Sequence, residues 1–350
     1  MLVHAIEIAG GIILVVFALR DVFDTVVVPG ESRGALRVAR RLLEITLPIW
    51  KRTRRGQSGI STSFAPAILM GSFLIWMVIL WLGFGLIAYA LGEWFSPPAD
   101  FQEALFIVGS ALCTVGLSGI GAHGPARWVL VLAGLSGLSV LTMAVTYLLQ
   151  VQEGISRRDA GILKLTTAAG QPPSAVGLLE RYAGLDSPEE IRRVLYRGRD
   201  WCATVLQSHA SHPSLIYFRS VGVGSGWPAT LGALMDLALM FELLIDDRES
   251  RALAILLRSE GLRLIDDLSG LIGLEPKSDD TTAAAVPRVC ARLTAAGYKV
   301  RSSVDAAEFA DKRRTHAGQV RAAAEHLGTI EAPLMPDLQL REKGESFRSA

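Results

Sequence analysis

The sequence predicts an all-α membrane protein with three transmembrane helices, a re-entrant half-helix between the second and third, and a cytoplasmic α-helical domain. Two observations lead to this fold class. Residues 64–92 and 128–151 form charge-free apolar runs of 29 and 24 residues, and a helix needs roughly 20 residues to cross a bilayer. After residue 152 the sequence turns polar and lacks the alternation of β-branched residues typical of strands. The second half is therefore predicted to be helical and outside the membrane.

The composition excludes several classes of protein. Half of the 350 residues are apolar, and the mean hydropathy is +0.36. The net charge of +1 gives no basic field that would attract nucleic acid, so no nucleic-acid partner is expected. Cys113, Cys202 and Cys290 are widely separated and odd in number, which favours reduced thiols over disulfides.

Residues 1–28 contain the least regular of the three expected spans. The apolar body IAGGIILVVFAL is followed by Arg20, Asp21 and Asp24, and charges at this depth are costly unless they pair or face protein. Arg20 and Asp24 have the i, i+4 spacing of a helical ion pair. The N-terminus MLVHAIE lacks the basic region and cleavage site of a secretory signal. We therefore expect residues 1–28 to be retained as a transmembrane helix.

The charges of the loops predict the orientation. The loop 29–63 carries eight basic residues against two acidic ones (Arg33, Arg37, Arg40, Arg41, Lys51, Arg52, Arg54 and Arg55, against Glu31 and Glu44). The loop between the second and third spans carries three acidic residues and Arg127. The positive-inside rule then places the N-terminus outside and the C-terminus in the cytoplasm of a multi-pass protein of the plasma (inner) membrane.

Residues 29–63 are predicted to be a basic, amphipathic cytoplasmic linker. Leu36, Ala39, Leu43 and Leu47 share one helical face, which is typical of a helix lying at a lipid surface. Trp50 is expected near the headgroups. An ordinary soluble linker helix is the alternative.

The loop between the second and third spans contains a short apolar helix that is unlike an exposed loop. Residues 101–114 read FQEALFIVGSALCT, a helix about 21 Å long that is too short to cross the bilayer. Glycines and small residues follow. Such irregular backbone is tolerated at membrane depth where it lines water or is buried in protein. Backbone carbonyls in this setting can replace the hydration shell of an ion, and the C-terminal end of the helix favours a cation.

The sequence after this half-helix is Thr114-Val115-Gly116-Leu117-Ser118-Gly119. Together with the flanking spans it resembles the pore module of the potassium channel superfamily in its bacterial two-helix form, over residues 64–151. The segments DVFDTVVVP and HPSLIYFRS also resemble parts of bacterial membrane proteins that carry one such module. The resemblance implies a pore helix at 101–114, a selectivity filter at 114–119, an inner helix at 128–151 and K⁺ as the permeant ion. Because each chain supplies one pore loop, it also implies a homotetramer.

The filter departs from the family pattern T-V-G-Y-G-D at three positions. Leu117 replaces the tyrosine, Ser118 the second glycine and Gly119 the aspartate. A serine with positive φ is strained, and loss of the tyrosine removes a ring that anchors the filter. We expect a looser and less selective filter. The alternative is a pore-like scaffold or sensor that does not conduct.

The expected inner helix carries Gly134 and Gly137. Small residues allow helices to bend or to approach closely, so these glycines are a possible gating hinge. Simple helix packing is the alternative explanation.

Residues 152–335 are predicted to form the cytoplasmic helical domain, and residues 336–350 a flexible tail. Ser187 and Glu190 have the spacing of a capping box. The apolar stretch that begins at Pro228 contains Asp236 and Glu242. Two carboxylates in lipid would be costly, so this stretch is predicted to be a buried helix of the bundle and not a fourth span.

Three further patterns in this domain are assigned structural roles. GVGSG at residues 222–226 departs from the spacing of a nucleotide-binding loop, and no strand precedes it, so a turn is expected. Cys202, His209 and His212 could share one helix face as metal ligands, but a fourth ligand is not evident, so the histidines are expected to lie at a helix end. The acidic doublets at 246–247, 266–267 and 279–280 lack the spacing of a calcium loop.

No catalytic set appears in the sequence: it holds no HExxH motif, and the spans hold no Ser/His/Asp set. We therefore expect no enzymatic activity, no catalytic or metal-binding residues and no cofactor. The expected partners are other copies of the chain and membrane lipids.

Overall fold

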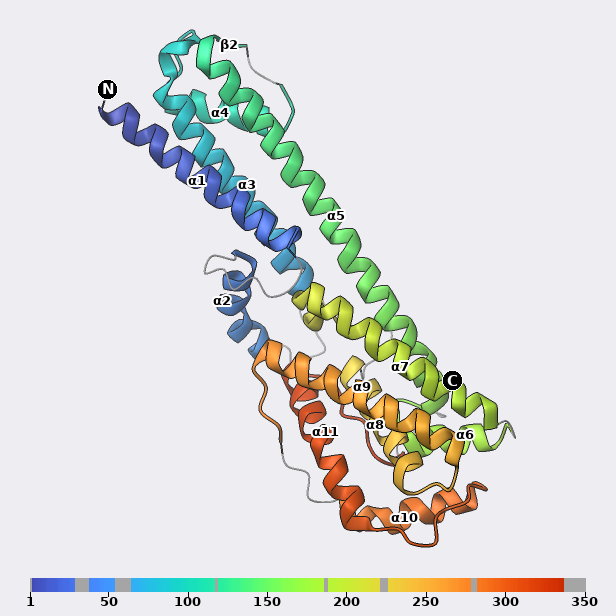
Figure 1. The fold of residues 1–350 in the computed structure, drawn as a ribbon. Coiled ribbons are helices and arrows are strands. Elements are labelled where there is room, and N and C mark those ends of the chain that lie inside the picture. The colour runs from blue at the N-terminus through green and yellow to red at the C-terminus, as the bar shows by residue number, and fades with distance from the viewer. Residues whose placement is uncertain are drawn as a thin grey trace, which may run out of the picture. The chain divides into compact units, whose positions relative to one another are not determined.

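The computed structural model describes residues 2–28, 38–53, 64–116, 119–185, 188–220, 226–277 and 282–336. The described chain is mostly α-helical, which confirms the predicted fold class. It divides into two compact units, Met1–Gln152 and Glu153–Ala350. The helix labelled α5 in Figure 1 belongs to both, because the boundary falls inside it.

In its described residues the first unit contains four apolar helices, one amphipathic helix and a short β-ribbon. Its elements are α1 (Leu2–Val26), α2 (Val38–Thr53), α3 (Phe64–Ala90), the 3-10 helix η2 (Gly92–Trp94), β1 (Phe95–Ser96), α4 (Phe101–Leu112), β2 (Gly121–Ala122) and α5 (Gly124–Ala169). Among the described residues, α1, α3 and α5 are the three helices long and apolar enough to cross a membrane. The three predicted spans are therefore found, although α1 ends two residues before the predicted residue 28 and α5 continues well past residue 151.

Helix α3 is the centre of the first unit, because α1, α2 and α4 all pack against it. The α1–α3 contact is close: a Cβ built on Gly11 would lie 2.5 Å from the carbonyl oxygen of Gly83. Small residues at such a crossing let two backbones approach, which is the usual way for helices to associate in a membrane.

A buried carboxylate joins three elements of this unit. Asp21 of α1 is 4% exposed. Its Oδ2 accepts a hydrogen bond from the indole Nε1 of Trp76 in α3 at 2.7 Å, and another from the backbone N of Val38, the first residue of α2, at 3.0 Å. The neighbouring pair Arg20–Asp24, expected from its spacing, is present at 3.8 Å. The charged residues of α1 therefore pair or face protein.

Helix α2 packs one side against α3 and leaves another exposed. Trp50 is 3% exposed and stacks on Phe64, the first residue of α3, with ring centroids 5.0 Å apart; its position near the headgroups stays a prediction. Leu43 and Leu47 are half-buried. Of the other two residues of the predicted apolar face, Leu36 and the side chain of Ala39 lie outside the described residues.

The second unit is a bundle built around one fully buried helix. After the end of α5 it contains α6 (Ala175–Ala183), α7 (Pro188–Ser211), the 3-10 helix η3 (Pro213–Tyr217), α8 (Gly226–Leu243), α9 (Arg248–Ile272), α10 (Thr282–Ala295) and α11 (Ala306–Leu327). Every residue of α8 from Gly226 to Glu242 is buried, with α9 and α11 packed against it (Figure 1). This confirms the prediction of a buried bundle helix, and α8 is not among the candidate spans of the described residues.

The two carboxylates of α8 are neutralised inside the bundle. Asp236 accepts hydrogen bonds from Arg313 at 2.8 and 3.1 Å and from His316 at 3.0 Å. Burial alone would raise the pKa of Asp236, but Arg313 and His316 together hold it below its usual value. Glu242 pairs with Lys312 at 2.8 Å. Removal of one partner would leave a charge without compensation, so these pairs matter to the integrity of the bundle.

The remaining patterns of this unit have mixed outcomes. Asp247 caps α9 by accepting from the backbone N of Ser250, and Asp246 pairs with Lys299 at 2.7 Å. No group of three or more His, Cys, Asp or Glu in the described residues is arranged to hold a metal ion. Several predicted features lie outside the described residues: Ser187 of the capping box, most of GVGSG, the doublet 279–280 and nearly all of the tail.

Candidate pore loop

The half-helix between the second and third candidate spans is α4, which runs from Phe101 to Leu112. Asp100 starts it as the N-cap, because its side chain accepts from the backbone N of Glu103 at 2.8 Å. Trp81 of α3 holds its middle: the indole Nε1 donates to the carbonyl of Leu105 at 2.7 Å, and the ring lies against Gly109. The predicted helix at 101–114 is thus present, two residues shorter.

The chain leaves α4 through a tight left-handed cap. The backbone N of Thr114 donates to the carbonyl of Ala111 at 3.0 Å, and the backbone N of Val115 donates to that of Ser110 at 2.9 Å. These are the two hydrogen bonds of a Schellman motif, with Thr114 in the left-handed position. Gly116 also donates to the Ser110 carbonyl, at 3.4 Å. The first residues of the predicted filter therefore fold back on the last turn of the half-helix.

Thr114 has a positive φ of 58°. For a β-branched residue this is a true outlier, since its Cβ crowds the backbone in this region. Strained backbone of this kind is concentrated at functional sites. Gly116 has a φ of 71°, which costs glycine little.

The described residues of the predicted filter are open to their surroundings in a single chain. Cys113, Thr114, Val115 and Gly116 are all exposed, and Val115 is 56% exposed. An apolar cavity of about 440 Å³ between α3 and α4 extends from Trp81 to Cys113 and Val115. Leu117 and Ser118, the two main departures from the family pattern, lie outside the described residues; Gly119 is described and has no regular secondary structure.

A two-residue ribbon closes the other side of the loop. β1 pairs with β2 in an antiparallel register, with Phe95 opposite Ala122. The backbone N of His123 donates to the carbonyl of Trp94 at 2.9 Å, and its Nε2 lies 3.1 Å from the hydroxyl of Ser96. The ribbon fixes the start of α5 relative to the chain that precedes α4.

Helix α5 approaches the end of α4 through glycine. A Cβ on Gly137 would lie 2.0 Å from the carbonyl oxygen of Leu112, and one on Gly134 would lie 3.3 Å from that of Ala111. Both glycines therefore lie where two backbones meet, and Gly137 accommodates no larger residue without a shift. The helix is continuous through both positions, and their role as a hinge stays a prediction.

Sequence reasoning missed three contacts that fix this site: the left-handed cap at Thr114, the hydrogen bond from Trp81 to Leu105, and the Asp21–Trp76 hydrogen bond. For Asp21 a signal existed, because a carboxylate inside an apolar span implies a buried partner. For Trp81 there was none, since tryptophan is also common on lipid-facing surfaces.

A capped half-helix with irregular, exposed backbone at its C-terminal end lies between two helices long and apolar enough to span a membrane, which is the order of elements expected of a pore loop. Residues 76–153 match a family model described as an ion channel. The matched segment starts within α3, ends within α5 and encloses all of α4 and the loop after it. This match supports an ion channel function for the chain. No curated protein and no solved structure matches it.

Proposed function

We propose that the chain forms a cation channel that conducts potassium through a filter at Thr114–Gly119. The observation that carries this proposal is the position of α4. Its C-terminal end, which has negative partial charge, presents the backbone of residues 113–116, inside the segment that matches an ion channel family. A cation is the ligand that such a helix end favours.

Several copies of the chain are needed to close the pore. One chain supplies one loop, and its filter residues are exposed, beside an apolar cavity that would be wetted in an isolated chain. A homotetramer arranges four loops around one axis and gives each filter residue a ring of equivalents. The basic loop 29–63 favours a plasma-membrane orientation with the N-terminus outside. The domain after residue 152 then lies in the cytoplasm, where it gates or assembles the pore.

A non-conducting scaffold or sensor is the second candidate, and one observation favours it. The left-handed cap uses the amides of Val115 and Gly116 on a single carbonyl of α4, which turns the chain away from an extended filter. Ser118 in place of the family glycine would add strain to any extended form.

The two candidates are separated by ion flux through the purified protein in liposomes, with K⁺ or Na⁺ as the sole permeant cation. Thr114→Ala and Gly116→Ala are the filter variants. Gly10→Ala and Thr204→Ala are their matched controls, because a Cβ at Gly10 meets nothing within 4 Å and the Thr204 hydroxyl is bonded within its own helix. The channel requires K⁺ flux that both filter variants abolish and both controls keep.

Two other outcomes point elsewhere. Equal Na⁺ and K⁺ flux would argue against potassium selectivity but would still support a cation channel. Absence of wild-type flux, with flux restored by Leu117→Tyr combined with Ser118→Gly, would favour the scaffold.

A further inference from the structure

An arginine of α5 that lies beyond the predicted inner helix, residues 128–151, is buried. Arg158 of α5 is 0% exposed, whereas the side chain of its neighbour Arg157 is exposed and pairs with Glu153 of the same helix. Burial lowers the pKa of Arg158, and the adjacent Asp159 carboxylate opposes this effect. A fully buried guanidinium is costly unless its donors are used, so its partners are informative.

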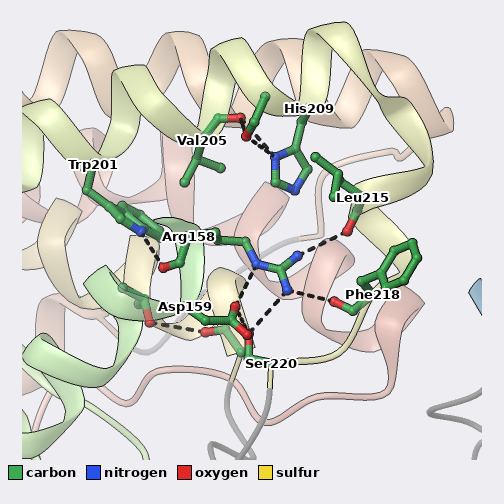
Figure 2. A network of polar contacts seen from close by, with 11 residues as sticks. Arg158, Asp159, Trp201, Val205, His209, Leu215, Phe218 and Ser220 are labelled. Atoms are coloured by element: carbon green, nitrogen blue, oxygen red, sulfur yellow. Dashed lines mark hydrogen bonds and ion pairs between the residues drawn. The ribbon is translucent and has the colours of Figure 1, made fainter. Parts of the chain in front are cut away.

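Arg158 binds the segment that follows helix α7. Its Nη1 donates to the carbonyl of Leu215 at 3.0 Å and its Nη2 to that of Phe218 at 2.9 Å. Its Nε donates to Asp159, which also accepts from the hydroxyl of Ser220 at 2.8 Å (Figure 2). One side chain of α5 thereby holds the segment 215–220 at two main-chain carbonyls and, through Asp159, at a hydroxyl.

The same face of α5 is clamped from α7. The indole Nε1 of Trp201 donates to the backbone carbonyl of Arg158 at 2.9 Å, as Figure 2 shows. The Trp201 ring covers Gly161, where a Cβ would meet it at 2.1 Å, and Leu215 covers Gly154, where a Cβ would meet it at 2.9 Å. Residues 154, 158 and 161 have the i, i+4, i+7 spacing of one helical face, so the whole face is committed to this contact.

We propose that Arg158 is a positioning residue through which the segment 215–220 sets the position of the pore-lining helix α5. This proposal rests on the proposed channel function. It names the contact between Arg158 and the segment 215–220, called the joint below, as the place through which the second unit acts on the pore. Two of the four acceptors of Arg158 are main-chain carbonyls, one within η3 and one directly after it. The contact therefore depends on the conformation of the segment 215–220. A change in that conformation releases or retightens α5, which is what a two-state coupling element requires.

The mild variants Ser220→Ala and Trp201→Phe test the joint without leaving a buried charge unpaired. Trp201→Phe removes one hydrogen bond and keeps an aromatic ring over Gly161. Ser220→Ala removes the bond to Asp159 at 2.8 Å and a long one from Arg158 Nη2 at 3.5 Å. Arg199→Gln is the matched control, because it breaks a side-chain pair with Glu260 (2.7 Å) between α7 and α9 in the same bundle. The readouts are K⁺ flux in liposomes and amide hydrogen exchange of residues 153–169 in the full-length protein.

The joint predicts that both variants change K⁺ flux in the same direction by about three- to tenfold, the effect of one lost hydrogen bond on an open–closed equilibrium. Exchange across 153–169 becomes faster in both, and the control changes neither readout. Arg158→Lys, which keeps the charge but loses the fork of donors, changes flux in the same direction.

If the wild type conducts and both variants leave the K⁺ flux unchanged, the proposed role of the joint is overturned, while the proposed channel function stands. If the wild type conducts neither ion, the proposed function fails, and exchange alone decides. Faster exchange across 153–169 in both variants then supports the joint, and unchanged exchange there overturns it.

Discussion

Gly137 and Leu112 lie so close together that a Cβ on the glycine would be 2.0 Å from the leucine's carbonyl oxygen. This contact joins the inner helix α5 to the last turn of the half-helix α4, directly before the filter residues. The geometry of the loop therefore depends on a backbone-to-backbone contact as well as on side chains.

Gly137→Ala should push α4 and α5 apart. Overpacking of this kind typically costs about 1–3 kcal/mol, because the obstacle is backbone and no flexible side chain can move aside. We expect a lower melting temperature of the purified protein in detergent, and loss of any K⁺ flux. Gly10→Ala, placed where nothing lies within 4 Å, should leave the melting temperature unchanged or slightly higher. Equal behaviour of the two variants would contradict the close contact.

Trp76→Phe should destabilise the first unit through Asp21. The variant keeps an aromatic ring but removes the indole donor, 2.7 Å from a buried carboxylate oxygen. A buried acceptor that loses a donor typically costs about 1–3 kcal/mol. Trp128→Phe is the control, because Trp128 is exposed and its loss should change little.

Thermal unfolding in detergent measures both variants. Combining Trp76→Phe with Asp21→Asn should cost less than the sum of the single changes, because the two residues share one interaction. Strict additivity would show that the hydrogen bond contributes nothing.

Hydropathy located the spans but not the ends of their helices. The apolar run, which is bounded by charges, predicts α3 at residues 64–92. The helix itself ends at Ala90. α1 starts at Leu2 since His4 and Glu7 bond to each other on the exposed surface and do not break the helix. α5 continues to Ala169 because a change from apolar to polar residues does not break a helix, and it ends where Gly170 has a φ of 89°.

The site was less predictable than the fold. The start of α4 at Phe101 agrees with its apolar run and its Asp100 cap, whereas its end at Leu112 comes two residues before the predicted one. The left-handed cap does not, since propensity places glycine in that position and Thr114 occupies it. Arg157 and Arg158 are chemically identical neighbours. Arg158 is the buried one because it lies on the same helical face as Gly154 and Gly161, against which other elements pack. The sequence alone does not show which face of the helix is packed.

Thr114→Gly should stabilise the loop while it removes the filter hydroxyl. A non-glycine residue in the left-handed region costs roughly 1–2 kcal/mol, which glycine avoids at a helix C-cap. We expect a higher melting temperature for Thr114→Gly and no gain for Thr114→Ala, which keeps the strained Cβ. Loss of stability in the glycine variant would indicate that the hydroxyl, and not the backbone, holds the cap.

The stability of the second unit should fall on acidification because of buried histidines. Burial and the nearby Arg158 lower the pKa of His209 to about 3, against a smaller opposing effect of its hydrogen bond to the Val205 carbonyl. Burial also lowers the pKa of His316. A histidine whose folded pKa is depressed binds its proton in the unfolded state first. The free energy of unfolding should therefore decrease as the pH falls below about 6.5, by up to about 1.4 kcal/mol per pH unit from His209 alone.

Unfolding at a series of pH values between 7.5 and 4.5 measures this slope. Asp236, whose pKa in the folded protein lies below its ordinary value, adds to the slope only as the pH approaches the unfolded pKa of about 3.9, at the acidic end of this range. His209→Gln, which retains a donor for the Val205 carbonyl but does not titrate, should reduce the slope and leave the part that comes from His316. His4→Gln, at an exposed position in α1, should retain the wild-type slope. If His209→Gln also retains it, the buried imidazole is not the group that takes up the proton.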